Sequence, residues 1–132
     1  MRNQAMTVVQ TMFGAFAKGD IDGITQTVAD TSTWTYHGTH EIPYAGEFVG
    51  KAGVAKFIQT IFETVDIQDF QVDQFIADGN TVVVLGSEQQ KIKANGEILS
   101  QKWVQVYQVE DGLITRMDEF ANTAHAEKLF TK

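Results

Sequence analysis

Four side chains are candidates for moving a proton or orienting a reacting oxygen: Glu88, Asp118, His37 and Tyr36. Carboxyl and imidazole groups serve as general acids and bases, and a phenol hydroxyl can orient a substrate oxygen. Glu88 shares its parity with two valines earlier in the same segment, so it faces either an apolar interior or the solvated rim beyond it. The rim is the commoner place, because unpaired glutamates are rarely buried. In an apolar enclosure the pKa of Glu88 would rise toward neutrality.

Two neighbouring acids near the end of the chain have opposite parity. Asp118 alternates with Arg116 and Phe120, whereas Glu119 alternates with Met117. Either acid is a candidate for an inward position, and a charged ladder on an exposed edge is an equally good interpretation. Parity alone does not choose between them.

Histidines are the remaining candidates. His37 follows Tyr36, and its unperturbed pKa near neutrality suits a proton carrier at a cavity mouth, although an ordinary surface histidine is the commoner role. His37, His40 and Glu41 form an H-x-x-H-E pattern in a predicted loop. Metal sites need at least three well-placed ligands, and such spacing is meaningful chiefly on a helix. We therefore expect no metal site and no cofactor.

Two aromatic pairs accompany these groups. Trp34 and Tyr36 lie on one face of a predicted strand, where they either stack on a flat ligand or fill a core. Trp103 and Tyr107 share the face of another strand and are more typical of a core or an interface.

Composition limits the possible partners. The 132 residues carry ten basic and seventeen acidic side chains, which gives a net charge of −7. A nucleic-acid backbone would be repelled, so we expect no nucleic-acid partner. The absence of cysteine excludes disulfides and thiolate chemistry. No apolar run is long enough to span a membrane, and the first residues lack the apolar core of a signal peptide. We expect a single domain over residues 1–132, located in the cytoplasm.

Hydrophobic periodicity predicts the elements that position these side chains. Apolar residues that repeat at helical spacing predict three helices. The first ends at about Lys18, the second begins at Asp20, and the third covers 51–65. A β-branched and aromatic run predicts a strand over 31–37, and the following segment, 40–50, is expected to be a loop. Tight-turn signals then separate four predicted antiparallel strands and a short helix, at 67–77, 81–93, 98–109, 113–121 and 123–130.

The predicted sheet is apolar on both faces. Val82 and Val84 point one way, and Val83 and Leu85 point the other. In the next strand, Trp103 and Tyr107 oppose Val104 and Val106. Three helices can cover only one face, so we expect a second copy of the chain to cover the other and form a homodimer through the sheet.

Short motifs support a family resemblance. The chain reads VVQTMF in the first helix, GDIDGI at the start of the second and ADTST at the entry to the first strand. With the order of elements, these motifs resemble the nuclear transport factor two-like fold, in its SnoaL-like and ketosteroid isomerase-like branch. The resemblance implies an α+β fold, a cone-shaped (cystatin-like) α+β barrel with three N-terminal helices packed on a curved, mostly antiparallel sheet. It also implies an apolar conical cavity.

The isomerase chemistry does not carry over. By the resemblance, the oxyanion-holding tyrosine falls on Met12 and the general-base aspartate falls on Tyr36. The protonated acid falls near Val104 or Gln105, neither of which can donate a carboxyl proton. Ketosteroid isomerisation by that mechanism is therefore not expected.

SnoaL-like members offer a second template. Their W-x-x-x-G and G-x-x-x-G patterns are matched by Trp34 to Gly38 and Gly46 to Gly50. Asn122 stands where these members tend to carry an acid, and an amide offers a polar contact without shuttling protons.

Three functions stay open from the sequence. One is a pocket protein that binds a small apolar or aromatic molecule. Another is an acid–base enzyme (an isomerase, aldol cyclase or dehydratase) that uses Glu88, Asp118 or His37, with Tyr36 orienting the substrate. The last is an accessory dimerisation module with a vestigial cavity. Ligand contacts are expected from six residues: Met12, Phe16, Trp34, Phe57, Trp103 and Asn122.

Overall fold

The computed structural model describes residues 3–132, which fold into four helices and one six-stranded sheet. The strands lie in the order β2-β1-β6-β5-β4-β3, with β1 and β6 parallel and the other neighbours antiparallel. The elements in chain order are α1 Gln4–Ala17, α2 Ile21–Thr25, β1 Val28–Tyr36, β2 Gly46–Val49, α3 Gly50–Thr64, β3 Val65–Asp78, β4 Thr81–Ile92, β5 Ile98–Glu110, β6 Leu113–Ala121 and α4 Thr123–Phe130.

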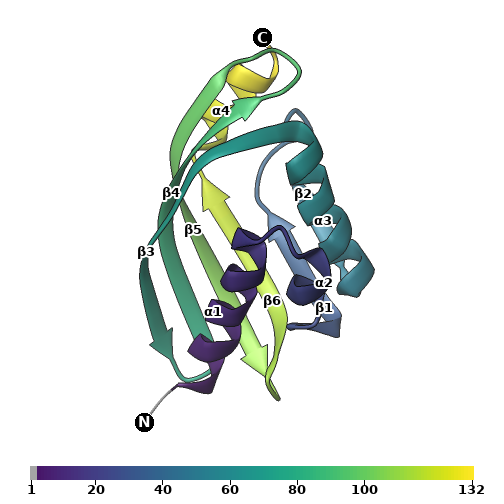
Figure 1. The fold of residues 1–132 in the computed structure, drawn as a ribbon, viewed down its shortest axis with the longest axis vertical. Coiled ribbons are helices and arrows are strands. Elements are labelled where there is room, and N and C mark those ends of the chain that lie inside the picture. Colours follow the sequence, from purple (N-terminus) through teal and green to yellow (C-terminus); the bar gives the residue numbers. More distant parts are fainter. Residues whose placement is uncertain (1–2) are drawn as a thin grey trace.

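The expected α+β architecture is confirmed. The sheet curves around α1, α2 and α3, which lie on its concave side, while α4 lies beyond one end of the strands (Figure 1). The sheet does not close, because β2 and β3 remain its edges in the described part of the chain. The cone is therefore open along one side.

One predicted boundary was wrong. The segment expected as a loop, 40–50, contains the short strand β2, which pairs with the end of β1 from Gly46 to Val49. Four residues are too few to show an alternation of apolar and polar side chains. The strand β2 forms because its backbone pairs with the edge of β1. Pairing with β2 also holds the C-terminal end of β1 on both sides, since β6 lies on the other.

Side-chain caps mark the starts of the first two helices, and the predicted start of α2 at Asp20 is confirmed. The Asp20 side chain accepts a hydrogen bond from the Gly23 N–H at 3.0 Å, which satisfies one free donor at the start of α2. At the start of α1, the Asn3 side chain accepts from the Met6 N–H at 3.0 Å. These caps fix where α1 and α2 begin and so orient their apolar faces toward the sheet.

Aromatic packing joins α1 to the concave face. Phe13 stacks on Trp103 with ring centroids 6.0 Å apart and meets Tyr107 edge-on at 6.1 Å. Trp103 lies directly across from Gly86 in β4, where any side chain would collide with the indole ring. Gly86 thus allows a large ring to lie against the strand, which sets the depth at which α1 packs.

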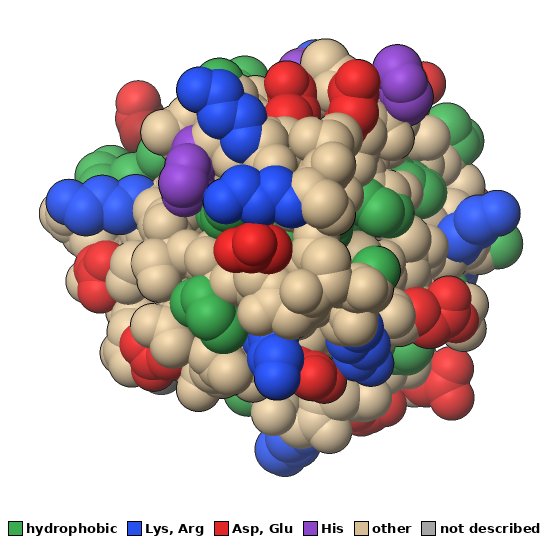
Figure 2. Space-filling model, turned by 90° about the horizontal axis from the view of Figure 1, so that it is seen from above, with side chains coloured by type: hydrophobic (Ala, Val, Ile, Leu, Met, Phe, Trp, Pro, Cys, Tyr) green, Lys and Arg blue, Asp and Glu red, His purple; other side chains and the backbone are tan. Residues whose placement is uncertain are grey.

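The surface differs from this interior. On the end of the molecule seen from above, acidic and basic side chains are interspersed (Figure 2). Among the described helices, none has both the length and the apolar character needed to cross a membrane.

Candidate active site

An apolar cavity lies between α1, α3 and the concave face of the sheet. Its empty space, counted out to the open mouth, is about 510 Å³. Its lining is rich in aromatic rings, which favours a flat apolar occupant. Eight aromatic side chains contribute to the lining: Phe13, Phe16, Trp34, Tyr36, Tyr44, Phe57, Phe70 and Tyr107.

Two carboxyl groups interrupt this apolar lining, Glu88 from β4 and Glu119 from β6. Among the described residues that line the cavity, none is Lys, Arg or His, so neither acid has a counter-charge there. Acidic groups without a counter-charge in an apolar site favour their neutral form.

Glu119 is the more deeply buried acid, with 7% of its surface exposed. It lies directly across from Gln105 in β5, and the Gln105 Nε2 donates a hydrogen bond to its Oε1 at 2.8 Å. Burial, reinforced by the nearby Glu88 charge and opposed by the Gln105 bond, raises the pKa of Glu119 from 4.5 to about 8. Glu119 is therefore a neutral acid at pH 7.

Glu88 also belongs to the cavity. The Gln101 Nε2 donates to its Oε2 at 2.6 Å from the facing position on β5. Burial raises the pKa of Glu88, and the Gln101 bond opposes that rise by stabilising the carboxylate. Of the two positions open from the sequence, inward or on the solvated rim, the structure selects the inward one.

Tyr36 stands beside Glu119, since the two residues are paired between the parallel strands β1 and β6. Tyr36 is 2% exposed, and its hydroxyl has no hydrogen-bond partner in the part of the chain that the structure describes. Burial raises the pKa of the Tyr36 phenol, and the negative charge of Glu119 adds to the rise. The phenol therefore stays protonated and is free to donate to a ligand.

Trp34 adds a second free donor. It lies two residues before Tyr36 on the same strand face, and its buried Nε1 is likewise without a partner among residues 3–132. Buried donors without partners cost free energy, about 1–3 kcal/mol each. A ligand with an acceptor oxygen would recover that cost.

Tyr44 and Gln90 complete the polar part of the lining. The Gln90 Nε2 donates to the Tyr44 hydroxyl at 2.9 Å, and the Tyr44 ring meets the Tyr36 ring edge-on at 5.0 Å. Burial raises the pKa of Tyr44. The Tyr44 oxygen acts as the acceptor in this bond, so its own O–H hydrogen points away from Gln90.

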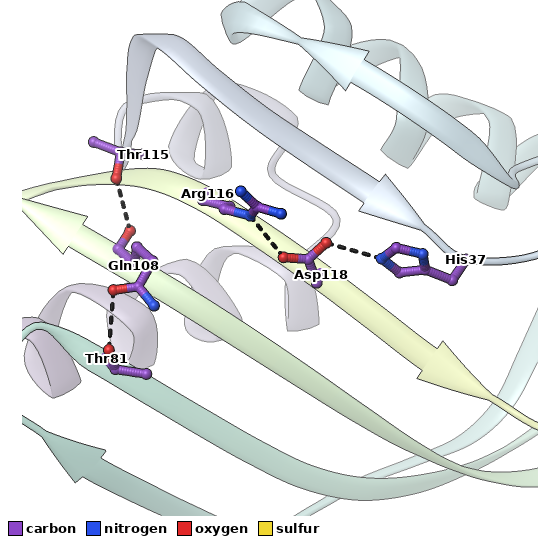
Figure 3. Close-up of polar contacts among 6 residues, drawn as sticks. All are labelled: His37, Thr81, Gln108, Thr115, Arg116 and Asp118. Atoms are coloured by element: carbon purple, nitrogen blue, oxygen red, sulfur yellow. Dashed lines mark hydrogen bonds and ion pairs between the residues drawn. The ribbon is translucent and has the colours of Figure 1, made fainter.

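A bulge in β6 decides which acid faces inward. Gln108 pairs with Arg116 and Val109 pairs with Ile114, so Thr115 is an extra residue on β6. The Thr115 hydroxyl donates to the Gln108 carbonyl at 3.3 Å (Figure 3). An extra residue reverses the alternation of faces along a strand. Ile114 and Met117 are consequently both buried although their parities differ.

Asp118 and His37, two of the predicted proton carriers, therefore lie outside the cavity. Asp118 Oδ1 lies 2.8 Å from His37 Nε2, and its Oδ2 accepts from Arg116 Nε at 2.8 Å (Figure 3). Partial burial raises the pKa of Asp118, but the bonds from Arg116 and His37 outweigh it and lower the pKa overall. This group is an ion-paired cluster on the convex face, where the β6 bulge turns Asp118 outward.

Comparisons with known proteins agree with this geometry. A family model described as a SnoaL-like domain matches residues 9–117. The chain belongs to the SnoaL-like family. No curated protein sequence matches the chain.

Solved structures place this SnoaL-like chain among nuclear transport factor two-like (NTF2-like) proteins. One from Burkholderia xenovorans LB400 is 25% identical with a TM-score of 0.88, over 96% of this chain and 95% of that one. Another, from Burkholderia pseudomallei K96243, is 26% identical with a TM-score of 0.89, over 99% and 100%. A protein with a ketosteroid isomerase-like fold from Catenulispora acidiphila DSM 44928 is 11% identical with a TM-score of 0.72, over 86% and 83%. The last likeness shows the shared fold alone.

Of the six residues predicted to contact a ligand in this SnoaL-like domain, four line the cavity and two do not. Met12, Phe16, Trp34 and Phe57 line the cavity. Trp103 does not, because its ring packs in an aromatic cluster with Phe13 and Phe70, whose centroids lie 6.0 and 5.2 Å away. Trp103 is a core residue.

Asn122 also lies outside the cavity lining. Its side chain accepts a hydrogen bond from the His125 N–H at 3.3 Å and caps α4. Asparagine is among the preferred capping residues, which explains its presence directly before a helix. The position that tends to be acidic in SnoaL-like proteins therefore has a structural role in this chain.

Four polar or phenolic lining residues were not among the predicted contacts: Tyr44, Gln90, Gln105 and Tyr107. Gln90, Gln105 and Tyr107 have inward parity on β4 and β5, which the alternation of buried valines and aromatics could have revealed. Tyr44 lies between β1 and β2 in a segment without periodicity, so no sequence signal placed it.

Proposed function

We propose that this SnoaL-like protein binds a small, flat, apolar molecule bearing a carbonyl oxygen and moves a proton on it by acid–base catalysis. The observation that carries the proposal is the pair of carboxyl groups in an aromatic cavity, beside a buried phenol that has no partner. Such a site combines shape for a flat ligand with groups that exchange protons near neutral pH.

The environments of the two acids suggest their roles. Burial, and after it the charge of Glu88, raises the pKa of Glu119 to about 8, so we assign Glu119 as the proton donor of the pair and Glu88 as the proton acceptor. Pairs of groups whose surroundings separate their pKa values mark an acid and a base. Glu88 would remove a proton from the carbon beside the carbonyl, while Glu119 and Tyr36 donate hydrogen bonds to the oxygen.

The reaction class follows from these roles. As the carbon–hydrogen bond breaks, its electron pair forms a carbon–carbon double bond, and the carbonyl oxygen becomes an enol by taking the Glu119 proton. Returning a proton to carbon regenerates the carbonyl group. Isomerisation, aldol cyclisation and dehydration all begin with this step. The aromatic lining lowers the polarity around the substrate, which strengthens the hydrogen bonds to the developing charge.

Exchange of hydrogen for deuterium tests the proposal without knowledge of the natural substrate. The flat ketones 2-indanone and 2-tetralone, incubated with the protein in D₂O, should lose their α-proton signals by NMR faster than with buffer alone. Glu88→Gln should abolish the acceleration, because an amide cannot accept the proton. Tyr36→Phe should retain part of the rate and cost on the order of 1–3 kcal/mol of transition-state stabilisation.

A matched control separates the site from the bulk protein. Glu110 lies exposed at the end of β5, and Glu110→Gln removes one carboxyl without touching the cavity. That variant should exchange at the wild-type rate. Binding of these ketones without exchange would instead support a simple pocket protein, and neither binding nor exchange would favour the accessory module.

A further inference from the structure

Glu119 is held by one of its two carboxyl oxygens. Its Oε1 accepts from the Gln105 Nε2 at 2.8 Å, whereas its Oε2 makes no hydrogen bond to any residue from 3 to 132. Gln105 faces Glu119 across the β5–β6 pair, so backbone pairing keeps the amide in reach. The contact therefore distinguishes the two oxygens of an otherwise symmetric group.

Tyr107 fixes the orientation of that amide. Its hydroxyl donates to the Gln105 Oε1 at 2.6 Å, and this is its one hydrogen bond within the described chain. Tyr107 is 1% exposed, so water does not offer an alternative acceptor. Turning the amide over would leave the Tyr107 O–H facing an N–H₂ group, and a buried donor without an acceptor is costly.

We infer that Tyr107 and Gln105 are positioning residues for Glu119, and that they hold Oε1 as an acceptor so that the exchangeable proton resides on Oε2. If the proton of the neutral acid were on Oε1, two donors would face each other, the Glu119 O–H and the Gln105 N–H. The Gln105 N–H therefore selects Oε1 as the carbonyl oxygen of the neutral acid. The inference rests on the proposed function only in its consequence, namely that Oε2 presents the proton to a substrate.

A second amide–carboxyl pair on the same strand face lacks this anchor. Gln101, four residues before Gln105, donates to Glu88 at 2.6 Å, but its own Oε1 is buried without a partner. The phenol of Tyr36 lies near the Gln101 side chain, but it makes no hydrogen bond there that matches the 2.6 Å bond from Tyr107 to Gln105. Among residues 3–132 the two pairs thus form an internal comparison, in which the amide of the Glu119 pair accepts a phenol hydrogen bond and the amide of the Glu88 pair does not.

The arrangement predicts how Glu119 titrates in variants. Gln105 stabilises the carboxylate form, so Gln105→Leu should raise the pKa of Glu119 further above its wild-type value of about 8. Tyr107→Phe leaves the amide free to turn, after which a neutral Glu119 can donate to the Gln105 oxygen. That new bond favours the neutral form and should also raise the pKa. Each rise is expected to be about one pH unit, a tenfold change in proton affinity.

The experiment is an NMR titration of protein labelled with ¹³C at glutamate carboxyl carbons, from pH 4 to 10. Loss of one resonance in Glu119→Gln assigns the signal of interest. Tyr107→Phe and Gln105→Leu should each move that titration upward. Gln101→Leu is the matched control, because it removes the same kind of bond from Glu88 and should leave the Glu119 midpoint unchanged or lower.

Infrared spectroscopy supplies a second readout of orientation. In the wild type the C=O stretch of neutral Glu119 should be lowered by the N–H bond to Oε1, and it should shift upward in Gln105→Leu. An unchanged Glu119 midpoint in folded Tyr107→Phe, or the same C=O stretch in wild type and Gln105→Leu, would overturn the inference. Neither measurement uses a substrate, so a failure of the ketone exchange assay would not affect this result.

Discussion

Glu119→Gln should remove much of the pH dependence of folding stability. The pKa of Glu119 is 4.5 when unfolded and about 8 when folded, because burial and the Glu88 charge disfavour ionisation. Between these values the unfolded chain has released the proton while the folded protein still holds it. The stabilisation from the neutral acid is therefore fully present below pH 4.5 and is lost as the pH rises to about 8.

The size of this effect follows from the two pKa values. Each pH unit between them changes the free energy of unfolding by 1.36 kcal/mol, so the total is on the order of 5 kcal/mol. Domains of this size have total stabilities of about 5–15 kcal/mol, so the loss would be readily measurable. Gln keeps the shape of Glu119 and an acceptor for the Gln105 amide, but it does not ionise.

Urea unfolding at a series of pH values from 5 to 9 measures the difference. Both tryptophans, Trp34 and Trp103, are buried, so their fluorescence reports unfolding. From pH 5 to 8, wild type should lose on the order of 4 kcal/mol relative to Glu119→Gln. Glu110→Gln, which removes an exposed carboxyl, should follow wild type. If the wild-type and Glu119→Gln curves stay parallel across this range, Glu119 is not held neutral and the reasoning is refuted.

Three further predictions concern assembly, ligand and core. We propose that the chain forms a homodimer through the convex face of the sheet, so Val104→Glu should give monomers or aggregates in sedimentation velocity; a well-folded wild-type monomer at micromolar concentration would contradict this. Flat neutral ligands should change the fluorescence of Trp34, whereas tight binding of a nucleotide in a thermal-shift assay would count against an apolar cavity. Gly86→Ala should destabilise by about 3 kcal/mol in urea unfolding, because its Cβ would collide with the Trp103 ring and the strand backbone. Gly14→Ala, with open space around it, should not destabilise.

Periodicity was sufficient for most of the fold. The apolar spacing of α3 and the turn signals between β3, β4, β5 and β6 predicted elements within about two residues of their observed bounds. These elements could be predicted because each has a long periodic pattern of its own. The strand β2 could not, because its four residues take their conformation from pairing with β1.

The same reasoning explains which site residues were found. Trp34 and Tyr36 follow the irregularity of β1, which ends at Thr33, and the bulges beside Glu88 place their extra residues on β3 rather than β4. The alternation along each strand is therefore intact around these residues, and parity placed all three on one face. Parity could not say whether Glu88 would be enclosed. That depended on α1 and on Tyr44, which bonds to Gln90, covering this part of β4. Such cover is a matter of tertiary packing rather than of alternation along one strand.

The choice between Asp118 and Glu119 shows where a single sequence becomes insufficient. Counting alternate residues from Ile114 places Asp118 inward, whereas counting from Met117 places Glu119 inward, and both starting residues are apolar. The extra residue Thr115 settles the choice because it shifts β6 against β5 by one position. Without that bulge, the cavity would receive the carboxyl now paired with Arg116 and would lose the one held by Gln105. The register of one strand therefore determines which acid is buried, and with it whether the cavity contains a carboxyl that stays neutral at pH 7.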